Sequence, residues 1–411
     1  MREIRVKSLF VTAALAGLML LPFASPPALT DILGASAAQA AEPTVGAAVG
    51  KPLKEAQDLA KANKFSDAMK KVKEANAISG KTAYETFVIN EFSTFLSVKL
   101  KDYGSAAQSA EAALATGQVP AKERPQRLKT LVQLNYSVKN YGKAISFAKQ
   151  YQQEAGADAE LQQLVTQAYY LQKDYPNAEA SAKALAASAK AAGRKPDETV
   201  LQLWLSSAFH QNDKAGQREA LTVLVANYPT PTYMGDLLNL VEADLGKSDR
   251  MSFEVYRLKL AAGTLKSSDD YVEMAQLAIQ LGLPGEAESV MEKGFAAGVL
   301  GGKNKSREQR LQTMAKQQAA QDAPTLQATA GTPKAKAALA EAYASYGKPD
   351  KAIALYKDAL ASTFPEADLA RLHLGQAYRA KGDAASARKA FSSVKDPKLA
   401  QLAQLWIAVA K

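Results

Sequence analysis

The chain has 411 residues, 47% of them hydrophobic, and a formal net charge of +10 at pH 7. Cysteine is absent, which excludes disulfide staples and thiolate metal sites. A basic balance favours anionic partners, but the charge is spread without a long basic run, so a solvated helical surface is the simpler explanation. The length suits two or three ordinary domains or one extended solenoid.

The first 40 residues have the composition of an export signal. Three basic residues within the first seven precede an apolar run at 9–24, and the small-x-small triplet Ala38-Gln39-Ala40 follows. Prolines shorten the apolar run to about 16 residues, below the roughly 20 that a membrane span needs, which argues against a membrane anchor. We therefore expect cleavage after residue 40, export to the periplasm and a net charge of +9 for the mature chain.

From residue 51 onward, alanines recur at the spacing of stacked helical units. An aromatic residue or proline stands three positions before an alanine, and small or apolar residues follow four and seven positions later. The pattern occurs at Phe65/Ala68/Val72/Ala75, Tyr103/Ala106/Ala110/Ala113, Tyr141/Ala144/Ala148/Tyr151, Tyr175/Ala178/Ala182/Leu185 and Pro284/Ala287/Met291/Gly294. The first four alanines are 38, 38 and 34 residues apart, which predicts one helical hairpin per repeat.

Two segments interrupt this pattern. At 187–197, Gly193 and Pro196 end one helix and Asp197 can cap the next, so we expect a joint between two halves of the stack. At 299–333, a capping box beginning at Ser306 predicts a basic, Gln-rich helix to about residue 320, followed by a loose run. Such an insertion lies on a binding face or is a tolerated surface loop.

The clearest repeats are at the C-terminus. Leu339, Ala340, Tyr343, Gly347, Ala352, Tyr356 and Ala359 are matched in order by Leu374, Gly375, Tyr378, Gly382, Ala387, Phe391 and Val394, 35 residues later. In the first copy, the residues before Gly347 form one helical face and those after it form a second. Gly347 can end the first helix in a left-handed conformation, and Pro349 suits the first turn of the second.

This template resembles the tetratricopeptide repeat, a 34-residue helix–turn–helix, with Val394 departing from the family's alanine. The resemblance implies an exported bacterial member of the family with an all-α fold. The fold would be an α-solenoid of about nine helical hairpins forming a right-handed superhelix. The expected organisation is a signal at 1–40, a linker at 41–50, repeats at 51–190, degenerate repeats at 191–298, the insertion at 299–333, and two well-matched repeats with a capping helix at 334–411.

By the same resemblance, the first helix of each hairpin lines a concave groove. The positions one and four residues after its small residue then point toward a ligand. The implied groove residues are Gln133, Tyr136, Gln167, Tyr170, Gln276, Ile279, Glu341, Ala344, Gln376 and Arg379. The alternative for Tyr136 and Tyr170 is ordinary packing between helices. The basic clamp with which some family members hold a C-terminal carboxylate is not recognisable at the matching positions.

Residues that could support catalysis are sparse. The two histidines, His210 and His373, stand alone on helical segments without metal-ligand spacing, and His373 is expected in the groove or on the surface. The acidic pair at 269–270 follows serines at a helix start, where capping is the stronger interpretation. Gly246-Lys247-Ser248 lacks the leading glycine of a phosphate loop.

We therefore expect a non-catalytic adaptor of the cell envelope that binds a protein or peptide segment in its groove. No cofactor, metal or nucleic acid is expected, and no stable membrane span after signal removal. The leading alternative is a module of a cell-wall or exopolysaccharide assembly machine that binds an anionic polysaccharide or other polyanion. A hydrolase is a distant third, because only about 35 residues lie outside the repeats, too few for a catalytic domain.

Overall fold

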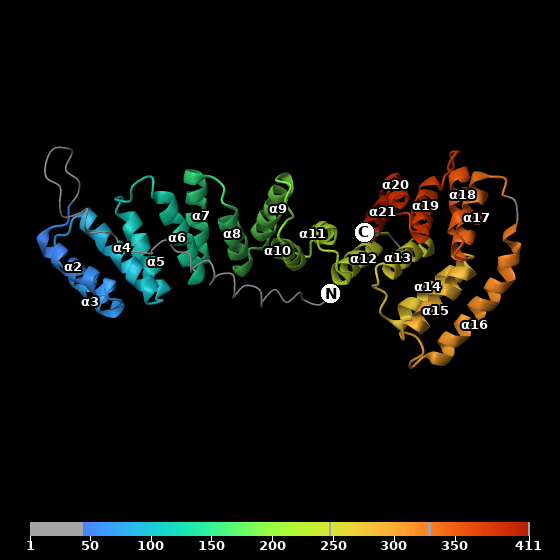
Figure 1. The fold of residues 1–411 in the computed structure, drawn as a ribbon, viewed down its shortest axis with the longest axis horizontal. Helices are drawn as coiled ribbons and strands as arrows, with labels where there is room; N and C mark the ends of the chain where they lie inside the picture. The colour runs from blue at the N-terminus through green and yellow to red at the C-terminus, as the bar shows by residue number, and fades with distance from the viewer. Residues whose placement is uncertain (1–43, 246–247, 328–329, 410–411) are drawn as a thin grey trace. The chain divides into compact units, whose positions relative to one another are not determined.

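The computed structural model describes residues 44–245, 248–327 and 330–409, and within these ranges every regular element is a helix (Figure 1). These ranges contain twenty α-helices, and all but α16 and α21 form nine consecutive pairs. The expectation of an all-α stack of about nine hairpins is confirmed. The predicted export signal lies outside the described residues.

The chain divides into two compact units, and the division falls between residues 217 and 218, within α11. The helices of the first unit are α2 (Ala47–Lys61), α3 (Phe65–Asn76), α4 (Ala83–Lys99), α5 (Tyr103–Ala115), α6 (Arg124–Ser137), α7 (Tyr141–Ala155), α8 (Ala159–Leu171), α9 (Tyr175–Ala191), α10 (Glu198–His210) and the start of α11 (Lys214–Asn227). The joint expected at 187–197 is instead the turn between α9 and α10, where Asp197 accepts a hydrogen bond from the Val200 backbone at 3.2 Å. We call residues 44–217 the N-terminal unit.

The remaining helices belong to the C-terminal unit, residues 218–409. They are α12 (Pro231–Leu245), α13 (Asp249–Ala261), α14 (Ser268–Gln280), α15 (Pro284–Ala296), α16 (Lys305–Asp322), the 3₁₀ helix η3 (Ala323–Gln327), α17 (Pro333–Ser345), α18 (Pro349–Ala359), α19 (Ala367–Lys381), α20 (Ala384–Ser392) and α21 (Pro397–Val409). The predicted cap at 267–270 is confirmed, since Ser267 and Asp270 form a reciprocal capping box on α14.

The hairpin α17/α18 forms as its sequence predicts. Gly347 has φ of 64° in the connecting turn, and Pro349 starts α18. Ala340, Ala352 and Tyr356 are completely buried where the two helices meet. In the next hairpin Gly375 replaces Ala340, because a Cβ atom there would come within 2.8 Å of the Phe391 ring. Small residues therefore mark the close helix contacts in both copies.

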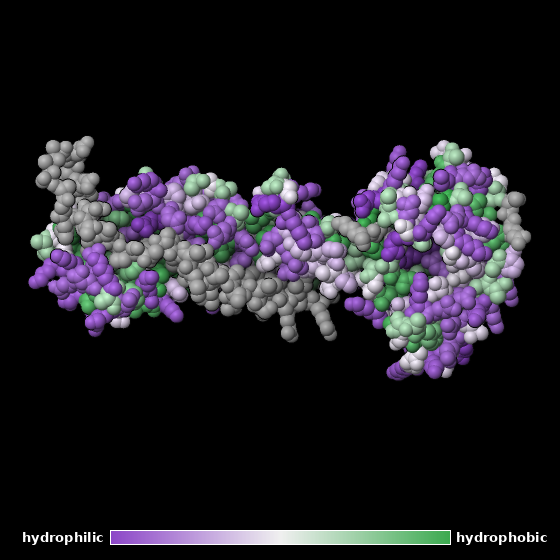
Figure 2. All heavy atoms as spheres, viewed as in Figure 1, coloured by the Kyte–Doolittle hydropathy of each residue, from purple (hydrophilic) through white to green (hydrophobic). Residues whose placement is uncertain are grey.

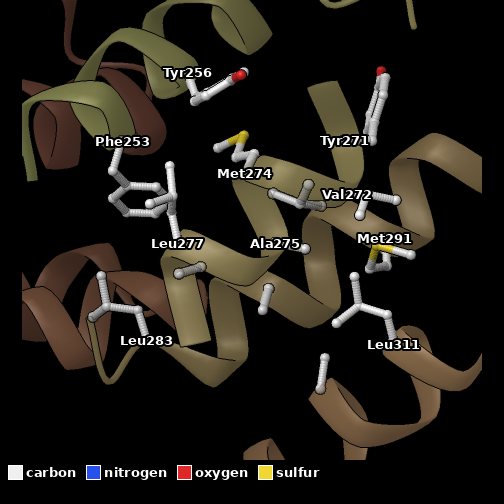
Figure 3. Close-up of a cluster of buried hydrophobic side chains, with 14 of the residues drawn as sticks. Phe253, Tyr256, Tyr271, Val272, Met274, Ala275, Leu277, Leu283, Met291 and Leu311 are labelled. Carbon is white, nitrogen blue, oxygen red and sulfur yellow. The ribbon is translucent and has the colours of Figure 1, made fainter. Parts of the chain in front are cut away.

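Most of the described part of segment 299–333 is helical, in α16 and η3, and α16 packs on the core instead of forming a surface loop. The N-cap of α16 is Asn304 and no side chain caps it, so the capping box predicted at Ser306 is wrong. Glu308 is instead buried, and its carboxylate accepts a hydrogen bond from the Gly301 backbone at 2.7 Å. Leu311 and Ala315 join the core cluster of α13, α14 and α15, around Met274 and Met291 (Figure 3).

Helix α21 covers the last hairpin, as expected of a cap, and also contacts α13 (Figure 1). Trp406 of α21 stacks on Phe391 with ring centroids 5.9 Å apart. The end of the chain thus returns to a helix that precedes it by about four hairpins. Hydrophilic side chains cover much of the visible described surface (Figure 2), and none of the described helices is long and apolar enough to cross a membrane.

Candidate protein-binding face

The predicted groove residues of the N-terminal unit form a hydrogen-bonded row across three helices. The Tyr136 hydroxyl on α6 donates to Gln167 Oε1 on α8 at 2.7 Å. One repeat on, the Tyr170 hydroxyl of α8 lies 2.8 Å from Ser206 Oγ of α10. In each case the tyrosine of one repeat bonds to the first groove position of the next repeat. We call Gln133, Tyr136, Gln167, Tyr170 and Ser206 the tyrosine–glutamine row.

Tyr136 has the packing role that was the alternative to ligand contact. Its side chain is 6% exposed, and its ring meets the Tyr141 ring edge-on with centroids 5.5 Å apart. Burial raises the pKa of Tyr136 well above its usual value, with a smaller contribution from Tyr141. The hydroxyl is therefore a fixed donor to Gln167, and Tyr136 presents little ring surface to a ligand.

Gln133 is the open member of the row. It is half-buried and makes no hydrogen bond with the described residues. Gln133 has no hydrogen-bond partner in the described structure because, in the preceding repeat, the position that corresponds to Tyr136 is occupied by Val98, 38 residues before Tyr136. Val98 packs against the small apolar cluster of Ala106, Ala107 and Leu134, and it has no hydroxyl that could donate to Gln133. The Gln133 amide therefore keeps its bonding capacity for a partner.

A partly exposed aromatic cluster lies at the other end of the row. The Tyr175 ring stacks on the His210 ring with centroids 4.3 Å apart, and Tyr170 meets Tyr175 edge-on at 5.6 Å. His210 is exposed, and Tyr170 and Tyr175 are half-buried. We call these three residues the aromatic cluster. His210, which seemed isolated in the sequence, is part of an apolar patch of the kind that anchors protein partners.

In the C-terminal unit, the corresponding groove positions hold a helix of the same chain. Gln376 of α19 donates to Glu254 Oε2 of α13 at 2.9 Å. Glu341 of α17 accepts from Arg250 of α13 and lies 3.0 Å from the Arg257 guanidinium. Glu254 is completely buried. Helix α13 therefore lies on the face that the resemblance assigned to a ligand.

His373 belongs to this contact on the groove face, where α13 covers it, so the alternative expectation of a surface residue is wrong. Its side chain is 5% exposed, and Nε2 lies 2.8 Å from Glu254 Oε1 across 119 residues of sequence. We call Arg250, Glu254, Arg257, Glu341, His373 and Gln376 the buried ion cluster. Glu254 and Arg257 are not among the residues that the sequence pattern indicates. The available signal was that residues 250, 254 and 257 put three charges on one helix face beside the buried Phe253.

The cluster brings together three residues of the types that ligate metals. Atoms of Glu254, Glu341 and His373 lie within 4.8 Å of one another. However, Arg257 Nη1 lies 2.8 Å from Glu254, 3.0 Å from Glu341 and 3.2 Å from His373 Nε2. The guanidinium takes the position that a shared metal ion would need, and the arrangement is an ion-pair network.

Burial and charge act in opposite directions on this network. Burial alone would raise the pKa of the Glu254 carboxyl, but the charges of Arg257 and His373 outweigh it and hold that pKa well below its usual range. The pKa of Glu341 is lowered by the same balance. Burial would lower the pKa of Arg257, yet Glu254, Glu286 and Glu341 raise it. Each charge is therefore stable only in the presence of its partners.

Acid should weaken the C-terminal unit through these carboxyls. Their folded pKa values lie below the unfolded value of 4.5, so their stabilising contribution is present above that pH and is lost as the pH falls below it. Each unit contains one of the two tryptophans, Trp204 or Trp406. We expect the urea midpoint reported by Trp406 fluorescence, in a Trp204→Phe background, to fall between pH 7 and about pH 3.5. An unchanged midpoint would contradict the ion-pair assignment.

Two other predicted groove residues, Gln276 and Arg379, lie elsewhere. Gln276 is exposed on α14. Arg379 of α19 places its guanidinium 5.3 Å from the centre of the Trp406 ring, and burial lowers its pKa. Arg379 therefore fastens α21 to α19, and neither residue joins the tyrosine–glutamine row or the buried ion cluster.

Residues 333–377, which include α17, α18 and most of α19, match the sequence profile of the tetratricopeptide repeat. This segment is a tetratricopeptide repeat. The predicted resemblance is confirmed there, and the repeat carries Glu341, His373 and Gln376 of the buried ion cluster. The face that α13 covers is thus a face of a tetratricopeptide repeat.

Several solved structures are similar to the chain at low identity. One is a tetratricopeptide repeat protein from Parabacteroides merdae, with 10% identity, 81% of this chain and 99% of that chain covered, and a TM-score of 0.31. Another is Naa15/Naa10 bound to HypK-THB, with 14% identity, 87% and 60% covered, and a TM-score of 0.32. Yeast Tom70 has 13% identity, 88% and 94% covered, and a TM-score of 0.24. A comparison with curated proteins gives no match.

Proposed function

We propose that the chain is a non-catalytic scaffold that binds a protein or peptide segment on the tyrosine–glutamine row of its N-terminal unit. A tetratricopeptide repeat and a stack of helical hairpins support a role in protein interaction. One observation within the molecule favours the row. In the C-terminal unit, the corresponding face holds a helical segment, α13, through Glu341 and Gln376. The same kind of face in the N-terminal unit would hold a segment of another protein.

The row offers suitable contacts for such a segment. Among the described residues, α6 and α8 make extensive contacts only with helices that are their near neighbours in the chain. Gln133 provides an uncommitted amide, and the aromatic cluster provides apolar surface at the other end. The hydrogen bonds from Tyr136 and Tyr170 fix the helices before any partner arrives, which reduces the entropy lost on binding.

The cellular setting of the proposal follows from the sequence. The basic, apolar and small-x-small segments of the first 40 residues support export, so the partner would be a protein of the bacterial envelope. The absence of a recognisable catalytic motif in the sequence supports an adaptor role. We propose a periplasmic adaptor that holds its partner without changing it chemically.

Site-specific photocrosslinking in cells tests the binding face. A photoreactive residue at Gln133 of the full chain should give a discrete adduct, because this position is half-buried on the row and makes no described hydrogen bond. The matched control is Lys149, exposed on α7. In the Gln133 background, Tyr170→Ala should reduce the adduct, while Tyr170→Phe, which keeps the ring, should preserve most of it. Equal adducts at positions 133 and 149 would contradict the proposal.

A further inference from the structure

The turns between paired helices repeat one backbone geometry along the chain. In those turns whose residues the structure describes, a residue at the helix C-cap or directly after it has positive φ, and the N–H of the next residue bonds back to a carbonyl five residues earlier, as Asp102 does to Ser97 at 2.9 Å. Glycine takes the positive-φ position at Gly282, Gly347 and Gly382 in the C-terminal unit. The N-terminal unit has other residues there, namely Asn63, Lys101, Lys139, Lys173 and Asn212. The three lysines have φ of 61°, 65° and 63°.

A left-handed backbone conformation has no steric cost for glycine and is tolerated by asparagine, but it is energetically unfavourable for lysine. The sequence nevertheless places lysine there in three consecutive repeats, always followed by Asp or Asn and then Tyr. The other two positions of this motif have structural roles. Asp102 and Asp174 cap α5 and α9, and the tyrosines pack, as Tyr141 does on Tyr136 and Tyr175 on Tyr170.

The lysines have no such structural role. Lys101, Lys139 and Lys173 are exposed, and none forms an ion pair with a described residue. Because the hairpins of a stack follow one another in the same sense, their corresponding turns come to one edge. Three lysines thus adopt an unfavourable backbone conformation although their side chains contact only solvent in the described structure. The helix dipole favours a cation just past a helix C-cap, but more weakly than the left-handed backbone disfavours lysine, so the recurrence of lysine points to function.

We propose that Lys101, Lys139 and Lys173 form a basic docking edge that binds an acidic polypeptide segment. The lysine ammonium groups favour an anionic partner, because the carboxylates of Asp102 and Asp174 in these turns already accept hydrogen bonds from the N-termini of α5 and α9. A polypeptide fits better than a nucleic acid, because the Tyr141 and Tyr175 rings already contact Tyr136 and Tyr170, and Tyr175 also stacks on His210, which leaves less ring face for bases. None of the three lysines is a member of the tyrosine–glutamine row or of the aromatic cluster, so their binding of an anion can be tested apart from the function proposed above.

The test uses the full chain, poly-L-glutamate of about 20 residues as the probe, and fluorescence anisotropy at about 20 mM salt. Lys101→Gly, Lys139→Gly and Lys173→Gly combined should weaken binding at least about tenfold and flatten its salt dependence. The urea midpoint reported by Trp204 should stay equal or rise, because glycine relieves the backbone. Lower stability together with weaker binding would overturn the proposal.

The matched control is Asn63→Gly with Asn212→Gly, which changes the same turn position in two other repeats without removing charge. It should leave poly-glutamate binding unchanged. Equal loss of binding in the control, or no loss in the triple variant, would overturn the basic edge. A dT20 oligonucleotide that bound more tightly than poly-glutamate and depended on the same lysines would overturn the polypeptide assignment.

Discussion

Replacing Glu254 with alanine should destabilise the C-terminal unit by about 3–5 kcal/mol, the usual effect of removing one partner from a buried ion pair. Glu254 is completely buried and contacts Arg257, His373 and Gln376. Its loss would leave the Arg257 guanidinium in a low-dielectric site with fewer counter-charges. Urea unfolding followed by Trp406 fluorescence, in a Trp204→Phe background, measures the change in free energy.

A matched control separates burial from simple loss of charge. Glu242 of α12 forms an ion pair with Lys259 of α13, the helix that also carries Glu254. The Glu242 side chain is 32% exposed. Glu242→Ala should therefore lower the stability by less than about 1 kcal/mol. The Glu254→Ala change should leave the transition of the N-terminal unit, reported by Trp204, in place. Equal effects of the two substitutions would show that the buried ion cluster does not hold α13 against α17 and α19.

Replacing Tyr136 with alanine should destabilise the N-terminal unit by about 3–5 kcal/mol, as for other buried aromatic side chains. The substitution removes a ring that packs on Tyr141 and a hydroxyl that bonds to Gln167. Tyr136→Phe removes only the hydroxyl and should lower the stability by about 1 kcal/mol. Trp204 fluorescence in a Trp406→Phe background reports both values.

The comparison of the two substitutions decides between packing and ligand contact. If Tyr136 mainly faced a ligand, alanine would lower the stability little and both variants would fold like the parent. The structure predicts instead that Tyr136→Ala lowers the stability strongly and Tyr136→Phe only slightly, because the ring contributes more than the hydroxyl. Loss of binding in a Tyr136→Ala variant would therefore not by itself identify a contact residue, whereas Tyr170→Phe and Tyr170→Ala can be compared on a folded background.

Local patterns made the hairpins predictable. The spacing of Ala340, Ala352 and Tyr356 predicts the close crossing of α17 and α18, and Gly347 predicts the turn between them. The Tyr136–Gln167 bond is also implicit in the repeat, because the partner lies three positions before the next copy of the tyrosine. The pattern does not show that groove residues of neighbouring repeats form hydrogen bonds with each other.

Contacts across several hairpins could not be predicted from local patterns. Glu254 and His373 are 119 residues apart and neither repeats with the template. The position of α13 on the tetratricopeptide repeat depends on how the C-terminal unit curves back, which no local spacing records. Segment 299–333 failed for a related reason. Ser306 and Gln309 have the spacing of a capping box, but α16 begins before Ser306, after Asn304, because the buried Glu308 binds the Gly301 backbone and Leu311 and Ala315 pack on the core of α14 and α15.

Hydrogen exchange on the full chain, with and without the partner that crosslinks at Gln133, tests the central claim most directly. If α13 fills the face of the tetratricopeptide repeat and the row of the N-terminal unit binds the partner, backbone amides of α6 and α8 should gain protection. Those of α13, α17 and α19 should exchange as before. Protection of α17 and α19 together with faster exchange in α13 would contradict the account, because the partner would then have replaced α13 on its own repeat.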